Sequence, residues 1–167
     1  AKTVLVERYG FMGGMASVGE IHPFMANHAD GVCLDRPVYV EWVRQMRSYL
    51  PATHGADQLQ SDELLAASDR MISKDAAMLA AEDLCQATGV DLIYHHTLQD
   101  VVGSDGRIDA VVLSSKSGLS AIKAKVYVDC SGDGDLAVRS GCKFEQGGPS
   151  GHSQPMTLCF KLAHVDR

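Results

Sequence analysis

The start of the chain combines three features that restrict its fold: a short apolar strand, an acid directly after it, and a glycine pair shortly downstream. Thr3 to Val6 predicts a buried strand, Glu7 follows it, and Gly13-Gly14 lies within the glycine-rich stretch Tyr9 to Glu20. Because glycine lets a backbone turn sharply and approach a ligand closely, this stretch is predicted as a loop with room for one helical turn.

Composition is that of a globular protein with room for one domain. The chain has 167 residues, of which 46% are hydrophobic, and a formal net charge of −6. Net negative charge disfavours nucleic acids and anionic membrane surfaces as partners. The apolar runs, such as Ala110 to Leu113, are far too short to span a bilayer. We expect no signal peptide and a cytoplasmic location.

Cysteine and histidine spacing predicts no metal site. The histidines form no HExxH motif, and no CxxC pair occurs. The stretch that starts at Asp129 matches the first half of an EF-hand loop, but its twelfth position is Ser140 instead of the required glutamate. The cysteines are therefore expected to be reduced and mostly buried. They are Cys33, Cys85, Cys130, Cys142 and Cys159.

Two helices are predicted from apolar periodicity and end signals. The first runs from the capping residue Asp35 to Leu50. The second runs from the capping residue Ser73 to Thr88, with Gly89 as its stop. The apolar face of the first helix consists of Val38, Trp42, Met46 and Tyr49. The small-residue face of the second is expected to pack closely on a sheet and consists of Ala77, Ala80, Ala81 and Leu84.

Most of the second half of the chain is predicted as strands. The sequence VDLIYHH at residues 90–96 predicts one strand, and turn signals at 104–106 and 115–118 separate the strands of a three-stranded antiparallel meander. The last strand of this meander is expected to continue as Lys125 to Cys130. It would then run into a second glycine-rich turn, SGDGD.

This second glycine-rich turn precedes a short predicted helix, Asp135 to Ser140. A strand, glycines and a helix start are the geometry by which a backbone approaches a nucleotide. The same pattern also fits a turn that only reverses the chain. Further on, residues 146–153 are predicted as a loop, and Thr157 to Leu162 as one more strand after the sequence QPMT.

Glu7 occupies a position that has a known role in one fold. In a Rossmann unit, an acid at the end of the second strand accepts hydrogen bonds from the adenosine ribose hydroxyls. Each charge-assisted bond of this kind contributes about 1.5–3 kcal/mol. The GxGxxG fingerprint expected about twenty residues upstream is not in the sequence. Taken alone, Glu7 is better explained as a solvated acid at the end of a strand.

Taken together, these segments resemble the bacterial FAD-dependent oxidoreductases of the glutathione-reductase-like superfamily. The matching segments cover nearly the whole chain and are VLVERYGFMGGMAS, GVDLIYHHTLQDVV, SDGRIDAVVLSSKSG, AKVYVDCSGDGDLAVRSGCKFEQG and QPMTL. The resemblance implies an α/β fold. It would be a partial Rossmann-like FAD-binding domain with a parallel sheet and an antiparallel three-stranded meander.

The resemblance also implies which residues bind FAD. Glu7 would hold the adenosine ribose, and Arg8 would be a further cofactor-binding residue beside it. Gly13, Gly14, Met15 and Ser17 would line the pyrophosphate and the approach to the flavin, and the backbone near Thr97 and Leu98 would contact adenine. Ser131, which replaces the usual threonine, and Gly132 would pass near the cofactor, Asp133 and Asp135 would continue that turn, and Met156 would lie near the isoalloxazine ring. No catalytic residue is implied.

The resemblance predicts one partial FAD-binding domain over residues 1–167. Residues 1–20 and 70–145 would form the dinucleotide-binding part, 21–69 an inserted helical and loop region, and 146–167 the start of a substrate-side segment. The family's first strand with GxGxxG and its C-terminal glycine-rich segment are not in the sequence. We therefore expect a fragment that binds FAD weakly or not at all, because the missing strand would leave sheet edges unpaired.

The implied function is that of an FAD-dependent oxidoreductase, which transfers a hydride from a small organic substrate to the flavin. Two alternatives remain open. One is a Rossmann-like enzyme that binds NAD(P), in which the charge of Glu7 would repel a 2′-phosphate and favour NAD. The other is a non-catalytic fragment or subunit that another chain completes. Its partner would be a complementing chain or a second copy in a homo-oligomer.

Overall fold

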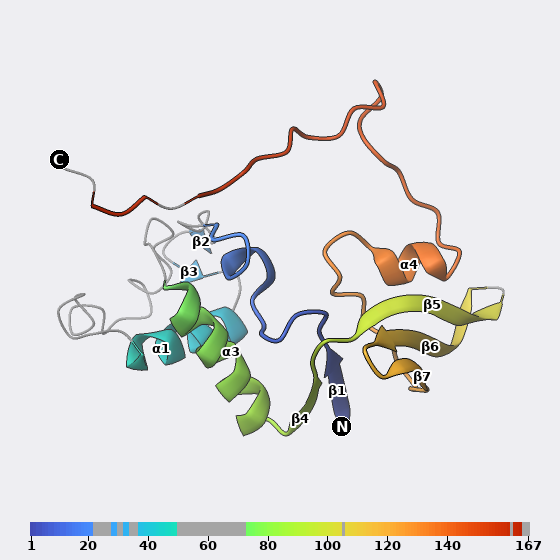
Figure 1. Cartoon of the computed structure of the whole chain (residues 1–167), viewed down its shortest axis with the longest axis horizontal. Coiled ribbons are helices and arrows are strands. Elements are labelled where there is room, and N and C mark those ends of the chain that lie inside the picture. The colour runs from blue at the N-terminus through green and yellow to red at the C-terminus, as the bar shows by residue number, and fades with distance from the viewer. Residues whose placement is uncertain are drawn as a thin grey trace. The chain divides into compact units, whose positions relative to one another are not determined.

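The structure is a computed structural model that describes residues 1–21, 28–29, 32–33, 37–49, 73–104, 106–160 and 162–164, with the backbone alone for 28–29 and 32–33. The chain separates into two compact units. Unit 1 comprises Ala1–Val4, Phe11–Asp91 and Leu158–Arg167, and unit 2 comprises Leu5–Gly10 and Leu92–Thr157. The described strands and α-helices, labelled in Figure 1, are β1 (Thr3–Val6), β2 (His28–Ala29), β3 (Val32–Cys33), α1 (Val38–Ser48), α3 (Lys74–Ala87), β4 (Val90–Ile93), β5 (Thr97–Ser104), β6 (Arg107–Ser115), β7 (Gly118–Ile122) and α4 (Asp135–Arg139). A 3-10 turn, η1 (Gly14–Ala16), follows β1 in the chain.

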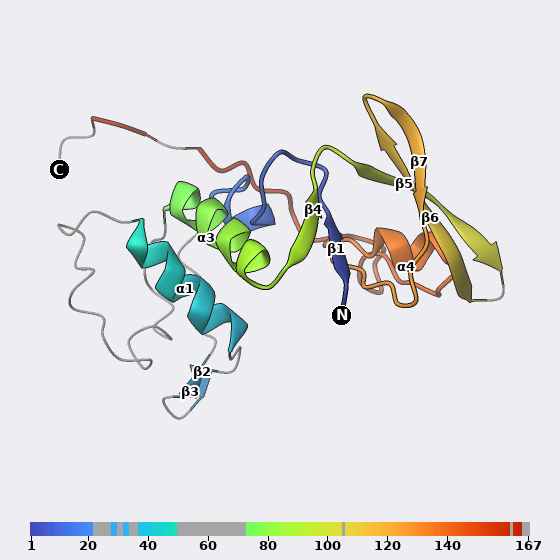
Figure 2. The same ribbon diagram turned by 90° about the horizontal axis from the view of Figure 1, so that it is seen from below.

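Strands β1 and β4 form a two-stranded parallel sheet and lie side by side in Figure 2. The pairing continues past the ends of both strands. The Glu7 N–H donates to the Ile93 carbonyl at 2.9 Å, and the His95 N–H donates to the Tyr9 carbonyl at 3.2 Å. Both segments therefore advance in the same direction. The two strands are confirmed, and Glu7 lies directly after β1.

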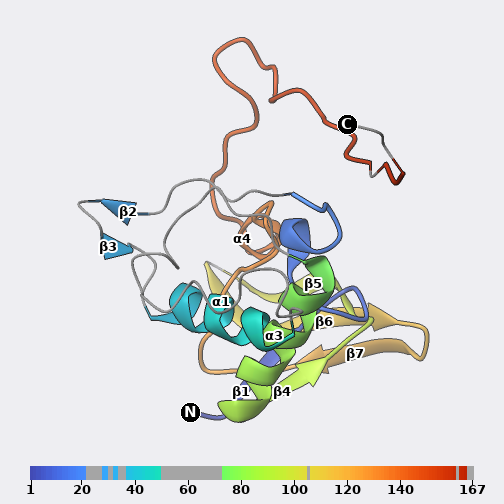
Figure 3. The same cartoon turned by 90° about the vertical axis from the view of Figure 1, so that its left-hand side faces the viewer.

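Strands β5, β6 and β7 form the predicted antiparallel meander in unit 2, which Figure 3 shows from another side. Its register places Thr97 opposite Ser114 and Val111 opposite Ile122. Apolar residues at the centre of β6 supply its buried side chains, and because two of them are adjacent in the chain, these two lie on opposite faces of the strand. Helix α4 packs beside β5, where the Arg139 Nε donates to the Gln99 carbonyl at 3.3 Å. The buried residues of β6 are Ala110, Val111 and Leu113.

Helices α1 and α3 pack against each other in unit 1 (Figure 2). The indole Nε1 of Trp42 donates to the Ala77 carbonyl at 3.0 Å and ties the two helices together. Alanines on α3 let the two helices approach closely, so that larger side chains of α1 fill the space between them. The buried cluster is Met46, Ala76, Ala77 and Ala80, with Trp42 and Val43 packed against it.

Helix α3 begins and ends at the predicted signals. The Ser73 hydroxyl accepts a hydrogen bond from the Ala76 N–H, and Thr88 is the C-terminal cap. Gly89 follows with φ 71°, a left-handed conformation that glycine adopts readily. For α1, the predicted capping residue Asp35 lies outside the described residues. None of the helices that the structure describes is long and apolar enough to cross a membrane.

Two predictions about helix faces are corrected. Val38 is 72% exposed because it is the first residue of α1, whereas Val40 is buried and was not predicted to be. Trp42 and Met46 are confirmed as packing residues, while Tyr49 is exposed and its hydroxyl donates to the Asp83 carboxylate. The small-residue face of α3 packs on α1 instead of on a sheet.

Two predicted strands are not formed. Residues 125–130 are irregular, and Val126 and Val128 are 76% and 75% exposed. The described residues of 157–162 are irregular as well. Alternating apolar residues predict the two faces of a strand, but a strand also needs a partner for its backbone hydrogen bonds. In the part of the chain that the structure describes, neither segment lies in a sheet.

The prediction of mostly buried cysteines is also corrected. Cys85 is half-buried on α3, whereas Cys130, Cys142 and Cys159 are exposed. These three lie in the irregular segments around and after α4, outside the packed clusters. The side chain of Cys33 lies outside the described residues. Burial raises the pKa of the Cys85 thiol, with a further contribution from the charge of Glu82.

Candidate functional site

Glu7 is held by its neighbours through both its backbone and its side chain. In addition to the hydrogen bond from its N–H to Ile93, its carbonyl accepts the His96 N–H at 3.1 Å. Its carboxylate Oε1 accepts the Tyr9 N–H at 2.9 Å. Within the described residues no hydrogen bond reaches Oε2. One carboxylate oxygen is therefore fixed by the chain, and the other is available to a ligand.

The predicted adenine-contacting residues lie next to Glu7 along the same backbone ladder. His96, which donates to the Glu7 carbonyl, directly precedes Thr97 and Leu98 at the start of β5. The predicted ribose and adenine contacts thus meet in unit 2. Arg8 lies there as well, with its Cζ 4.7 Å from the centroid of the Tyr9 ring, a cation–π arrangement.

The turn before α4 is organised by Asp129, a residue that the sequence analysis did not assign to this turn. Its Oδ1 accepts the N–H and the hydroxyl of Ser131 at 2.9 and 2.7 Å, and its Oδ2 accepts the Ala137 N–H at 3.0 Å. The Ser131 hydroxyl, followed by backbone N–H groups, lowers the pKa of Asp129. Gly134 at the cap position of α4 has no side chain to bond, so the signal that could have identified Asp129 is an acid several residues further upstream of the predicted helix.

Ser131 has a structural role in the same turn. Its hydroxyl donates to Asp129 and also accepts the Asp135 N–H at 2.9 Å. Asp135 pairs with Arg139 at 3.1 Å along α4, and Asp133 is exposed. The hydroxyl of Ser131 therefore connects the start of the turn to the first residue of the helix.

The glycines of this turn leave the backbone open. Gly132 and Gly134 have φ of 91° and 74°, which explains why glycine is present. A Cβ placed on either would meet no atom within 4 Å. A ligand could therefore approach the backbone on that side, and this fits the predicted contact with a cofactor.

The turn Gly13–Ser17 lies in unit 1 and contains the predicted helical turn. Gly13 has φ 111°, and a Cβ there would lie 2.8 Å from the Ser17 Oγ. Ser17 is 2% exposed and its hydroxyl donates to the Met12 carbonyl at 2.9 Å. Gly13 and Ser17 thus hold the turn together, whereas Gly14 has open space around it and Met15 is exposed.

Met156 stands apart from the other predicted contacts. Its side chain is fully exposed, so it touches none of the candidate residues described above. The structure therefore brings Glu7, Arg8, Thr97 and Leu98 together. It forms a separate turn from Ser131 to Asp135, and it gives Met156 no contact with either group.

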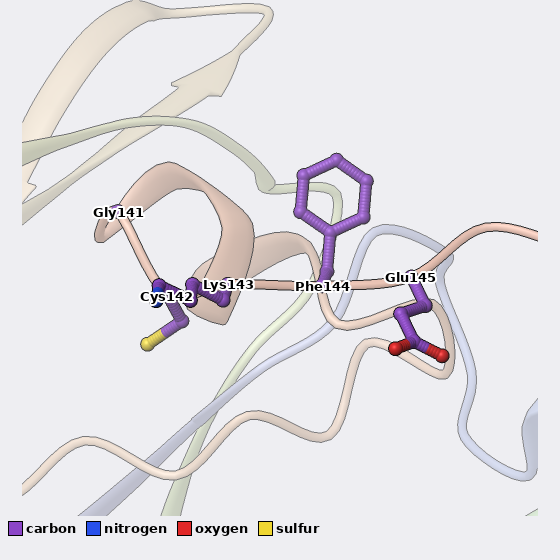
Figure 4. A pocket seen from close by; sticks show the side chains of 5 residues that line it. All are labelled: Gly141, Cys142, Lys143, Phe144 and Glu145. Atoms are coloured by element: carbon purple, nitrogen blue, oxygen red, sulfur yellow. The ribbon is translucent and has the colours of Figure 1, made fainter.

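A shallow hollow follows α4, but its side chains do not converge on a common space (Figure 4). It is lined by five consecutive residues, Gly141 to Glu145. In Figure 4 the side chains of Cys142, Phe144 and Glu145 point in different directions instead of into a common space. Ligand sites need polar groups that converge, so we assign no site here. Within the described ranges, no group of three or more His, Cys, Asp and Glu side chains is placed to hold a metal ion.

The parallel strand pair, the antiparallel meander and the helices make this a mixed α/β protein, consistent with part of an FAD-binding domain. A comparison with protein families gives a match to the family described as FAD dependent oxidoreductase over residues 1–167. The chain belongs to this family, which confirms the resemblance. Comparisons with curated proteins and with solved structures gave no match.

Proposed function

We propose that unit 2 binds the adenosine half of FAD and that the chain serves an oxidoreductase reaction. The observation that carries this proposal is the Glu7 carboxylate, whose Oε1 accepts the Tyr9 N–H and whose Oε2 has no hydrogen bond from any described residue. Ribose hydroxyls are donors, and an ionised carboxylate is the acceptor that suits them. Each such bond contributes about 1.5–3 kcal/mol.

Other residues would complete the cofactor contacts. The backbone at Thr97 and Leu98 would contact adenine, and Arg8 lies beside the ribose acid. The open backbone at Gly132 supports a further contact of the turn from Ser131 to Asp135 with the cofactor. The assignment of Gly13, Gly14, Met15, Ser17 and Met156 to the pyrophosphate and flavin side rests on the family resemblance alone.

The chemistry that FAD supplies when bound is acceptance of a hydride from a small organic substrate. The residues of this chain would bind and orient the cofactor, and we assign no catalytic acid or base. The dinucleotide-binding part would comprise residues 1–20 and 70–145, with an inserted region at 21–69 and a substrate-side segment at 146–167. The whole chain would act as one FAD-binding domain in this proposal.

The test is a titration of FAD into the ¹⁵N-labelled chain, followed by nuclear magnetic resonance because this method detects weak binding residue by residue. We expect FAD to shift the amides of residues 7–10 and 96–98. Glu7→Gln should raise the Kd about tenfold or more, because a neutral amide accepts a weaker hydrogen bond from ribose. Glu145→Gln, which removes an exposed charge elsewhere in unit 2, is the matched control and should leave the Kd unchanged.

An unchanged Kd for Glu7→Gln would contradict the proposed role of Glu7. A parallel titration with NAD⁺ separates the two cofactors. The family match favours FAD, so we expect FAD to bind more tightly than NAD⁺. Saturable NAD⁺ binding without a response to FAD would favour the nicotinamide alternative.

A further inference from the structure

The ring of His95 lies directly against Gly10, the residue that ends the turn after Glu7. A Cβ at Gly10 would lie 2.8 Å from both the Cε1 and the Nε2 of this ring, closer than real Cβ atoms approach other atoms. Gly10 is not among the residues with a left-handed φ. A side chain here would force the ring of His95 to shift, so space, and not backbone conformation, is what favours glycine at this position.

The backbone of His95 is itself unusual. Its φ is 57°, in the left-handed region that few residues other than glycine adopt. This conformation lies between β4 and β5, where the peptide groups of Ile93, His95 and His96 all hydrogen-bond to the turn at Glu7 and Tyr9. Such conformations persist where the surrounding structure holds them, and they gather at functional positions.

These contacts form a series that leads from the His95 ring to the carboxylate of Glu7. The His95 ring packs on Gly10, and the His95 N–H holds the carbonyl of Tyr9. The N–H of Tyr9 in turn holds the Oε1 of Glu7. The direction of the Tyr9 N–H therefore sets the direction of the carboxylate.

We propose that His95 is a positioning residue: its ring, seated on Gly10, holds the turn Glu7–Gly10 so that the Glu7 carboxylate is aimed at its ligand. This inference rests on the proposed function, because the ligand would be the ribose of FAD. The ring of His96, in the same segment between β4 and β5, provides a contrast. Its Nδ1 lies 2.7 Å from the carbonyl of Tyr94, so it is engaged away from Gly10.

A ligand-free experiment tests the positioning step directly. His95→Ala should lower the amide hydrogen-exchange protection of Tyr9 about fivefold or more, because the turn loses the ring that packs on Gly10. His96→Ala, the matched control, should retain that protection. Gly10→Ala should lower the protection of Tyr9 as well, because the added Cβ displaces the ring, and the two losses should not add in the double variant Gly10→Ala/His95→Ala, because both substitutions remove the same contact. Unchanged protection in His95→Ala, or additive losses in the double variant, would overturn the inference.

A ligand experiment separates positioning from simple structural support. His95→Ala should weaken FAD binding about fivefold in the otherwise unaltered chain and have no further effect in the Glu7→Gln background, since the effect passes through Glu7. An equal loss in both backgrounds would overturn the positioning role. Failure of the unaltered chain to bind FAD would contradict the proposed function, and the exchange experiment would still decide the role of His95.

Discussion

At the scale of residues, two acids of unit 2, Asp129 and Glu7, have different roles. Both carboxylate oxygens of Asp129 accept hydrogen bonds from the chain, Oδ1 from the N–H and hydroxyl of Ser131 and Oδ2 from the Ala137 N–H, so its charge stabilises the start of α4. Within the part of the chain that the structure describes, a hydrogen bond reaches only one oxygen of the Glu7 carboxylate, from the Tyr9 N–H. Asp129 is therefore a structural acid, and Glu7 is the acid suited to a ligand.

The lowered pKa of Asp129 predicts a pH dependence for α4. An unfolded aspartate titrates near a pKa of about 3.9, and the folded value lies lower because hydrogen bonds favour the charged form. The stabilisation is therefore fully present above about pH 4 and is lost as the pH falls through the folded pKa. Amide exchange of Ala137, measured as a function of pH, should show loss of protection over this acidic range.

Substitution provides the control for this pH dependence. Asp129→Asn should remove the acidic loss of protection and lower the protection at neutral pH. Asp133→Asn changes an exposed neighbouring acid and should alter neither the acidic loss of protection nor the protection at neutral pH. A titration of the Asp129 carboxyl carbon at or above the ordinary aspartate pKa would contradict the account.

The sequence indicated the strand-end acid and the glycine turns, because both depend on residues adjacent in the chain. The role of Asp129 could have been inferred from its distance to the predicted helix start. The packing of His95 on Gly10 could not, because it depends on the pairing of β1 with β4. Contacts between residues far apart in the chain need the fold before they can be seen.

At the scale of elements, unit 1 depends on the close packing of α1 and α3. Met46→Ala should lower the free energy of unfolding by about 2–5 kcal/mol through the cavity it leaves. Ala80→Leu should lower it by about 1–3 kcal/mol through overpacking. Chemical denaturation followed by fluorescence of Trp42, the single tryptophan, measures both changes.

The exposed face of α3 offers a matched control for these core substitutions. Leu79 is an exposed side chain on the same helix. Leu79→Ala should change the free energy of unfolding by less than about 0.5 kcal/mol. A loss of stability as large as that of Met46→Ala would show that the buried cluster has been misassigned.

The irregularity in the β5–β6 pairing predicts a position where glycine is required. Gly103 lies at a register shift, and a Cβ there would come within 2.0 Å of the Arg107 carbonyl oxygen. Gly103→Ala should therefore destabilise the meander by about 1–3 kcal/mol. Amide exchange of Val111 and Val112 measures this change.

Gly148 is the control for Gly103. It has no left-handed φ, and an added Cβ would meet no atom within 4 Å. Gly148→Ala should leave the exchange of the meander amides unchanged. If the amide protection of Val111 and Val112 is the same in Gly103→Ala as in the unaltered chain, the described register is contradicted.

Elements with strong local signals were predicted well. Ser73 and Gly89 defined α3 to within one residue at each end, and the turn signals separated the three strands of the meander. The predicted strands at 125–130 and 157–162 are not formed, because a strand depends on a pairing partner that local alternation does not reveal. The exposed position of Val38 likewise reflects where α1 begins.

At the scale of the whole molecule, large apolar side chains stay exposed in the irregular segments. Leu158 and Phe160 are 88% and 77% exposed and alternate with more polar residues. Exposed segments of this kind promote association. Sedimentation velocity should show self-association that increases with concentration and decreases in the variant Leu158→Ser/Phe160→Ser.

Leu119→Ser is the matched control for this measurement. Leu119 is an exposed apolar side chain on β7, within an established strand pair. Its substitution should leave the association unchanged. A monomer at every concentration for the unaltered chain would contradict the prediction.

The central claim for the whole chain is that Glu7 and the start of β5 bind the adenosine half of FAD. The most direct measurement is of intermolecular nuclear Overhauser effects between FAD and the labelled chain. The account predicts contacts from the adenosine ribose protons to residues 7–9 and from the adenine protons to residues 96–98. Contacts confined to other residues, with none to Glu7 or Thr97, would contradict it.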